Sequence, residues 1–226
     1  MSDKPDHLGH RQRLRDRFNK GGADALPDYE LLELLLFQSR PRGDLKPLAK
    51  RLIKHFGSFA AVLTAPPQRL LEIEDVGEAT VTALKVAEAS ALRLSQGQIL
   101  EQPVLSSWQA LLDYCQAAMS HSKNEQFRIL FLDRKNKLIA DEVQQTGTVD
   151  HAPVYPREVV KRALELGASA IILVHNHPSG DPAPSGSDIS ITEKVVQAGK
   201  SLGIVVHDHL IIGKGTHTSF KSMGLL

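Results

Sequence analysis

The sequence predicts an α/β domain with a mixed sheet and flanking helices, preceded by a small all-α domain. Over residues 1–100 the apolar residues recur at helical spacing. From residue 101 on, amphipathic helical segments alternate with short apolar segments typical of strands. The chain has 226 residues and is 42% hydrophobic, so each half has material for a core of its own.

The first half is expected to contain several short helices. Helical periodicity is clearest over residues 29–37, 48–56 and 79–94, and Gly57 stands where a helix C-cap is favoured. The polar stretch 95–107, with a glycine and a proline, is interpreted as the linker between the domains.

The second half alternates between the two periodicities. Pro156 and Gly167 stand where a helix start and a helix end are favoured, and residues 169–175 are almost wholly apolar, as in a buried central strand. Helices are expected at 108–119, 156–167 and 187–203, and strands at 127–133, 137–146, 169–175, 204–213 and 216–220.

Composition narrows the class of protein. The chain carries 27 basic and 26 acidic residues, a balance that argues against a strongly basic nucleic-acid binder while leaving room for a local basic patch. The single cysteine, Cys115, has no internal disulfide partner and lies in an apolar helical stretch, which favours a buried, inert thiol. No apolar run approaches the roughly 18 residues of a membrane span, and the N-terminus lacks an apolar signal segment. We expect a cytoplasmic protein without a membrane partner.

Two histidines end the apolar strand, and an acidic residue follows at the start of the next helix. His175 and His177 are two residues apart in extended chain, so their imidazoles point to the same side. A loop with three prolines leads on to Asp188, whose carboxylate can return to the two imidazoles. Two histidines and one carboxylate, with a fourth position open to water, form a catalytic zinc ligand set.

Each part of this pattern also has a purely structural explanation. Ser185 and Asp188 together form a Ser-x-x-Asp helix start, in which the serine caps the first turn. His-x-His pairs occur by chance, and the loop sequence taken alone is a turn. The combination at this spacing is far more specific than any one part.

The spacing His-x-His-x7-Ser-x2-Asp resembles the signature of the JAMM (MPN-plus) metalloproteases. The surrounding sequence is similar to the RadC family in particular, namely HNHPSGDPAPSGSD, with GTVDHAPVYPREVVKRAL before it and DHLIIG after it. The similarity covers essentially the whole chain. It implies a JAMM/MPN domain over residues 101–226, with a layout like that of cytidine deaminases. Asn176 departs from the eukaryotic JAMM pattern, which has Ser or Thr there, but fits RadC.

The resemblance also implies a mechanism. One zinc per chain, held by His175, His177 and Asp188, would activate water to hydrolyse an amide, peptide or isopeptide bond of an unknown protein or peptide substrate. The family's general base precedes the first strand, which is the position of Glu125, and Ser185 would assist the developing oxyanion. Glu142 and Glu158 are the rival candidates for the base.

A second histidine pair, His207 and His209, flanks Asp208 on a predicted strand. The two-residue spacing again places both imidazoles on one side, but no carboxylate loop completes a ligand set. We interpret these residues as structural, or as orienting a metal ligand.

The alternative function is a DNA-associated repair or recombination module. Residues 70–87 resemble a helix-hairpin-helix, which binds DNA phosphates through backbone N–H groups. Asp75 replaces the first glycine of the usual hairpin and adds negative charge where phosphate would lie. The basic run 11–17 offers a solvated face or a flexible arm. A protein-packing hairpin is the competing interpretation.

Overall fold

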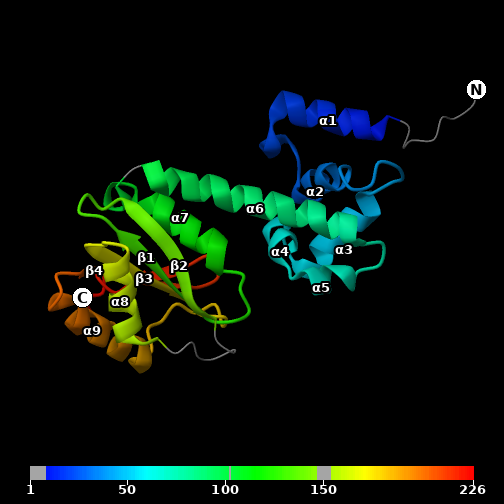
Figure 1. Cartoon of the computed structure of the whole chain (residues 1–226). Helices are drawn as coiled ribbons and strands as arrows, with labels where there is room; N and C mark the ends of the chain where they lie inside the picture. The colour runs from blue at the N-terminus through cyan, green and yellow to red at the C-terminus, as the bar shows by residue number, and fades with distance from the viewer. Residues whose placement is uncertain (1–8, 102, 147–153) are drawn as a thin grey trace, which may run out of the picture. The chain divides into compact units, whose positions relative to one another are not determined.

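A computed structural model describes residues 9–101, 103–146 and 154–226. The chain forms two compact units, which divide between Ala91 and Leu92, inside the long helix α6 (Glu78–Glu101) (Figure 1). No helix among the described residues is both long enough and apolar enough to cross a membrane.

The first unit is helical, as predicted. Its core is formed mainly by leucines from successive helices, among them Leu32, Leu52 and Leu84. The basic run 11–17 lies within the first helix, whose Leu14 is buried in this core, so the run belongs to a packed helix. Its elements before α6 are α1 (His10–Gly21), η1 (Ala23–Ala25), α2 (Asp28–Leu36), α3 (Lys46–Phe56), α4 (Phe59–Thr64) and α5 (Pro67–Leu71).

The predicted linker is wrong over its first half. Residues 95–101 continue helix α6, and Ile99 is fully buried in the core of the second unit. The polar residues of this stretch are compatible with a helix, and Gly97 is tolerated inside it at a cost of about 1 kcal/mol. Helix α6 ends before Pro103, which lacks the N–H needed to continue it.

The second unit is a five-stranded mixed sheet with helices on both faces, which confirms the predicted fold class. In the part of the chain that the structure describes, the strand order is β2-β1-β3-β4-β5; the β3–β4 pair is parallel and the other three pairs are antiparallel. All five predicted strands are present within one residue at each end. The elements are η2 (Val104–Ser106), α7 (Trp108–Met119), β1 (Gln126–Leu132), β2 (Leu138–Thr146), α8 (Pro156–Glu165), β3 (Ala170–Asn176), α9 (Gly186–Lys200), β4 (Val205–Ile212) and β5 (His217–Ser219).

The central strand β3 is buried on both faces, which explains its unbroken apolar sequence. Alternate residues of β1 and β3 pack on opposite sides. Ile171 and Leu173 share one core with α8 and α9, whereas Ile172 and Val174 share the other with α7. His175 continues the first series, so its ring emerges on the α9 side at the end of the strand.

Candidate metal centre

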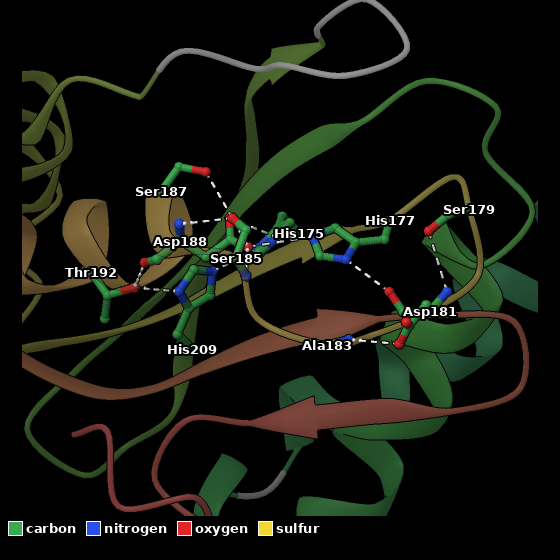
Figure 2. A network of polar contacts seen from close by, with 10 residues as sticks. All are labelled: His175, His177, Ser179, Asp181, Ala183, Ser185, Ser187, Asp188, Thr192 and His209. Atoms are coloured by element: carbon green, nitrogen blue, oxygen red, sulfur yellow. Dashed lines mark hydrogen bonds and ion pairs between the residues drawn. The ribbon is translucent and has the colours of Figure 1, made fainter.

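The three predicted ligands lie together at the end of β3 (Figure 2). The Nε2 atoms of His175 and His177 are 2.9 Å apart. Asp188, on the first turn of α9, places Oδ1 3.3 Å from His175 Nε2 and Oδ2 3.5 Å from His177 Nε2. Two ligands of a tetrahedral zinc lie about 3.3 Å apart, because each bond is about 2.0–2.1 Å long. The three side chains therefore fit a zinc ion.

The capping box expected from Ser185 and Asp188 is also present. The Ser185 side chain accepts a hydrogen bond from the Asp188 backbone N–H, while the Ser185 backbone N–H donates to Asp188 Oδ2 at 2.7 Å. The Ser185 hydroxyl lies 2.6 Å from the same carboxylate oxygen. The structural and the metal-binding interpretations of this motif are therefore compatible, since the cap fixes the carboxylate that faces the histidines.

A buried chain of hydrogen bonds fixes the tautomer of His175. Thr192 Oγ1 lies 2.5 Å from the Asp188 backbone carbonyl, which can only accept, so the hydroxyl donates to it. His209 Nδ1, 2.6 Å from the same hydroxyl, must then carry a proton and donate to it. His209 Nε2 is left as an acceptor for His175 Nδ1–H, at 2.8 Å. The lone pair of His175 is consequently on Nε2, which faces the metal position.

His177 is held in the same tautomer by a different partner. Its Nδ1 lies 2.8 Å from the backbone carbonyl of Asp181, so Nδ1 carries the proton and Nε2 carries the lone pair. Two nitrogen lone pairs and a carboxylate thus converge on one point. Such an arrangement is stabilised by a cation between them, as when an outer hydrogen bond orients each metal-bound histidine.

The pKa shifts agree with this assignment. Burial lowers the pKa of His175 to about 4 and lowers that of His209 well below its usual value, so both rings are neutral near pH 7. A hydrogen bond to Asp188 raises the pKa of His177. Burial alone would raise the pKa of Asp188, but the hydrogen bond that His177 donates and the charge that His175 carries when these rings are protonated, together with the hydrogen bonds from Ser185, hold it far below its usual value. The carboxylate is therefore ionised, as a metal ligand must be.

Glu125 lies near the cluster and is not part of it. It is half-buried immediately before β1, and its negative charge contributes to the raised pKa of His177. Two residues further on, Phe127 stacks on the His175 ring, with ring centroids 6.0 Å apart. Glu125 is thus within electrostatic reach of the ligands from the neighbouring strand.

The rival glutamates have partners elsewhere. Glu142, on β2, forms a bidentate ion pair with Arg162 of α8, with N–O distances between 2.6 and 3.1 Å. This ion pair lowers the pKa of Glu142. Glu158 lies in the first turn of α8 and pairs with Arg157 at 3.2 Å.

The second histidine pair is divided by a β-bulge. Val206 pairs with Ile171 and Asp208 pairs with Ile172, so His207 is an extra residue in β4. His207 accordingly contacts Asn136 at 2.7 Å, whereas His209 contacts the candidate ligand His175. The two-residue rule assumes an unbroken strand and therefore fails for this pair.

Asp208 is a structural residue in the same region. Its carboxylate accepts hydrogen bonds from the backbone N–H groups of His209 and Lys221 and from the hydroxyl of Ser219. These bonds hold β4 against the segment that follows it. Sequence reasoning missed Thr192 and the Asp181 carbonyl, since neither a helical threonine nor a backbone oxygen forms a recognisable pattern.

In the helical unit, the predicted helix-hairpin-helix corresponds to α5, a turn and the start of α6. Asp75 has a left-handed backbone, with φ of 69°, at the turn where the usual motif has glycine. Its carboxylate pairs with Arg51 at 2.9 Å, and its carbonyl accepts from Arg40 at 3.0 Å. The hairpin is thus bound to cationic side chains of its own chain, an arrangement that favours the protein-packing interpretation.

The fold and the ligand cluster define a class of protein: a JAB-type α/β domain whose His-His-Asp triad resembles a JAMM metal site. Family models match in both halves of the chain, a RadC-like JAB domain over residues 105–225 and a UPF0758 N-terminal domain over residues 6–82. The chain belongs to the RadC family.

Two curated relatives support this assignment over nearly their full lengths. A UPF0758 protein of Rhodobacter capsulatus is 66% identical over 213 residues, which are 94% of this chain and 100% of the relative. The UPF0758 protein SPO0054 of Ruegeria pomeroyi is 62% identical over 217 residues, which are 96% of this chain and 97% of the relative. The resemblance seen in the sequence is therefore confirmed.

Proposed function

We propose that this protein is a zinc-dependent hydrolase that cleaves an amide, peptide or isopeptide bond. The observation that carries the proposal is the convergence of three metal-ligand atoms, two of them imidazole nitrogens whose lone pairs are fixed by outer hydrogen bonds. Two imidazoles and one carboxylate suit zinc, and three protein ligands leave a position open, as in catalytic sites.

His175, His177 and Asp188 would hold the metal. When bound, zinc would supply a Lewis acid that lowers the pKa of a water molecule to roughly 7 and polarises the substrate carbonyl. Glu125 would act as the general base, accepting a proton from the attacking water and returning it to the leaving amine, and its charge already acts on His177.

Ser185 is proposed to stabilise the oxyanion that develops on the substrate. Its hydroxyl lies 2.6 Å from Asp188 Oδ2 and 2.7 Å from the hydroxyl of Ser187. A hydroxyl rotates at little cost, so it can turn from the carboxylate towards a substrate oxygen. Ser187 remains as a partner for the rotated group.

The first experiment measures metal content and turnover together. Protein purified without chelator should contain about one zinc per chain. Glu125→Gln should keep the zinc and lose on the order of 10²–10⁴ in rate, because the isosteric amide cannot accept a proton. The probes are a panel of fluorogenic peptide amides and lysine isopeptides.

Glu142→Gln and Glu158→Gln are the matched controls, since each removes the same charge away from the ligands. Both should turn over the probes like the parent. Normal turnover by Glu125→Gln beside an inactive control variant would transfer the role of base to another glutamate. The absence of any bound divalent ion in the parent would contradict the metalloenzyme proposal itself.

A further inference from the structure

Asn176 stands between the two histidine ligands, and its side chain leaves the sheet on the opposite face. The side chain is 1% exposed. Since β3 alternates, the imidazoles of His175 and His177 point to the metal position while the amide of Asn176 points towards the end of β1. A buried amide in this position needs partners of its own.

Its partners are the two peptide groups that flank Glu125. Asn176 Oδ1 accepts a hydrogen bond from the backbone N–H of Gln126 at 2.9 Å. Asn176 Nδ2 donates to the backbone carbonyl of Asn124 at 3.1 Å. The two contacts together fix both the orientation of the amide and the backbone on either side of Glu125.

We infer that Asn176 is a positioning residue: its amide clamps residues 124–126 and so aims the Glu125 carboxylate at the metal centre. This inference rests on the proposed function, because it assigns Glu125 the role of base. It gives each residue of the tripeptide His-Asn-His a role. The two histidines face the metal position, and the asparagine, on the opposite face, holds the segment that carries the proposed base.

An amide is suited to this task because it offers an acceptor and a donor on one planar fork. A carboxylate at position 176 could accept from Gln126 but could not donate to Asn124. The Asn124 carbonyl also accepts from the Ser122 hydroxyl at 2.8 Å and so keeps a partner when the amide is removed, which makes the Gln126 N–H the group to follow in the test.

The test is a double-mutant cycle on zinc-loaded protein with the same amide and isopeptide probes. Asn176→Ala should keep about one zinc and lose roughly 10²-fold in rate, which is the effect of displacing a reacting group by about 1 Å. The double variant Asn176→Ala, Glu125→Gln should be no slower than Glu125→Gln alone, because a positioning residue has no effect once the group it positions is absent.

Val174→Ala is the matched control. Val174 is also fully buried, two residues earlier on the same strand and face, so its truncation loosens the packing without removing an amide. It should keep zinc and turnover. Asn176→Asp, which retains the acceptor for Gln126, should lose less activity than Asn176→Ala and serves if the alanine variant is poorly folded.

Hydrogen exchange supplies a measurement that does not depend on turnover. The Gln126 amide should exchange faster in Asn176→Ala than in the parent or in Val174→Ala. Unchanged exchange, loss of zinc, or a double variant clearly slower than Glu125→Gln would each overturn the inference.

The failure of the inference is distinguishable from the failure of the proposed function. An inactive Glu125→Gln beside a fully active Asn176→Ala contradicts the inference alone. A parent that hydrolyses none of the probes contradicts the proposed function, and the exchange of the Gln126 amide then decides whether Asn176 holds the segment.

Discussion

The sheet of the second unit carries a polar cluster on each face, and the two clusters are built in opposite ways. On the α7 side, Arg128, Asp141 and Tyr114 form a buried group. Arg128 Nη1 lies 2.6 Å from both carboxylate oxygens of Asp141, and the Tyr114 hydroxyl donates to the same carboxylate. In this cluster donors meet acceptors and the charges cancel.

The electrostatics of this cluster stabilise its charged state. Burial would lower the pKa of Arg128, but the charge and hydrogen bonds of Asp141 raise it. Burial and the hydrogen bond to Asp141 raise the pKa of Tyr114, which stays protonated as a donor. The charges of Arg128 and Asp141 are balanced within the protein, and the Nε–H of Arg128 is the one buried donor of this cluster without a partner among the described residues.

On the α9 side, acceptors meet acceptors. The Nε2 lone pairs of His175 and His177 and the carboxylate of Asp188 face one another. Only a cation, whether a proton or a metal ion, reconciles three such groups. The difference teaches that buried polarity alone does not indicate a functional site. What distinguishes the α9 side is that its hydrogen bonds point outward and leave lone pairs inside.

The largest effect is expected from removing a ligand. His177→Ala should abolish zinc binding at micromolar metal, a greater loss than the roughly 10–100-fold cost of an outer-shell change. Because the ring is only half-buried, the metal-free variant should stay folded. Metal content and thermal unfolding in chelator are the measurements.

Asp188→Ala is a less clean test of the same comparison. It should also lose the metal, but it removes the half of the α9 capping box in which the Ser185 backbone N–H donates to the Asp188 carboxylate, and so costs up to about 1 kcal/mol of stability in addition. Full zinc occupancy in His177→Ala would show that the α9 side is not an acceptor-only cluster, and the comparison would fail.

The next largest effect lies on the opposite face. Asp141→Ala leaves the buried guanidinium of Arg128 without its counter-charge, which should cost about 3–5 kcal/mol of the free energy of unfolding. Zinc stoichiometry should not change. Denaturant unfolding of metal-free protein measures the loss, and the double variant Arg128→Met, Asp141→Leu should recover much of it. A stable Asp141→Ala protein would contradict the view that this cluster is structural.

These two faces differ in how far the sequence predicts them. The proximity of His175, His177 and Asp188 was predictable from strand alternation, from the proline-containing loop and from the resemblance to the JAMM signature. The Arg128–Asp141 pair was not predicted, since its partners lie on two strands and a residue's pairing partner depends on register. Fold class and all five strands were predictable from periodicity alone.

The remaining differences have local causes. The polar composition of residues 95–101 predicts a linker, but polar residues are also compatible with a helix, and helix α6 continues to Glu101. His207 and His209 contact different partners because of a one-residue bulge in β4, which no periodicity predicts. Thr192 is found only once α9 and β4 are side by side.

Acidification should weaken metal binding because one proton competes with the metal for the site. The pKa of His177 is raised above its usual value by its bond to Asp188, while burial lowers that of His175 to about 4. Below the His177 pKa a proton must leave Nε2 before metal binds, so affinity should fall roughly tenfold per pH unit, about 100-fold between pH 6 and pH 4. Competition with a metal indicator measures the slope. A flat profile would exclude His177 as a ligand, and a slope of two protons would contradict the depressed pKa of His175.

The smallest effect is expected from the outermost member of the site, Thr192. Thr192→Val keeps the shape and removes the hydroxyl, so the buried Nδ1–H of His209 loses its acceptor. The ring can avoid this cost, about 1–3 kcal/mol, by moving its proton to Nε2. Nε2–H would then oppose the Nδ1–H of His175 and push the proton of His175 onto the metal-facing nitrogen.

Zinc affinity should therefore drop about tenfold in Thr192→Val, at the lower end of the losses expected when a residue that orients a metal ligand is changed. Thr192→Ser retains the hydroxyl and should bind zinc like the parent, which separates the hydrogen bond from the loss of the methyl group. Nitrogen-15 shifts of the imidazoles in metal-free protein report the tautomers directly. Equal zinc affinity in the valine and serine variants, with unchanged tautomers, would show that the tautomer of His175 does not depend on the Thr192 hydroxyl.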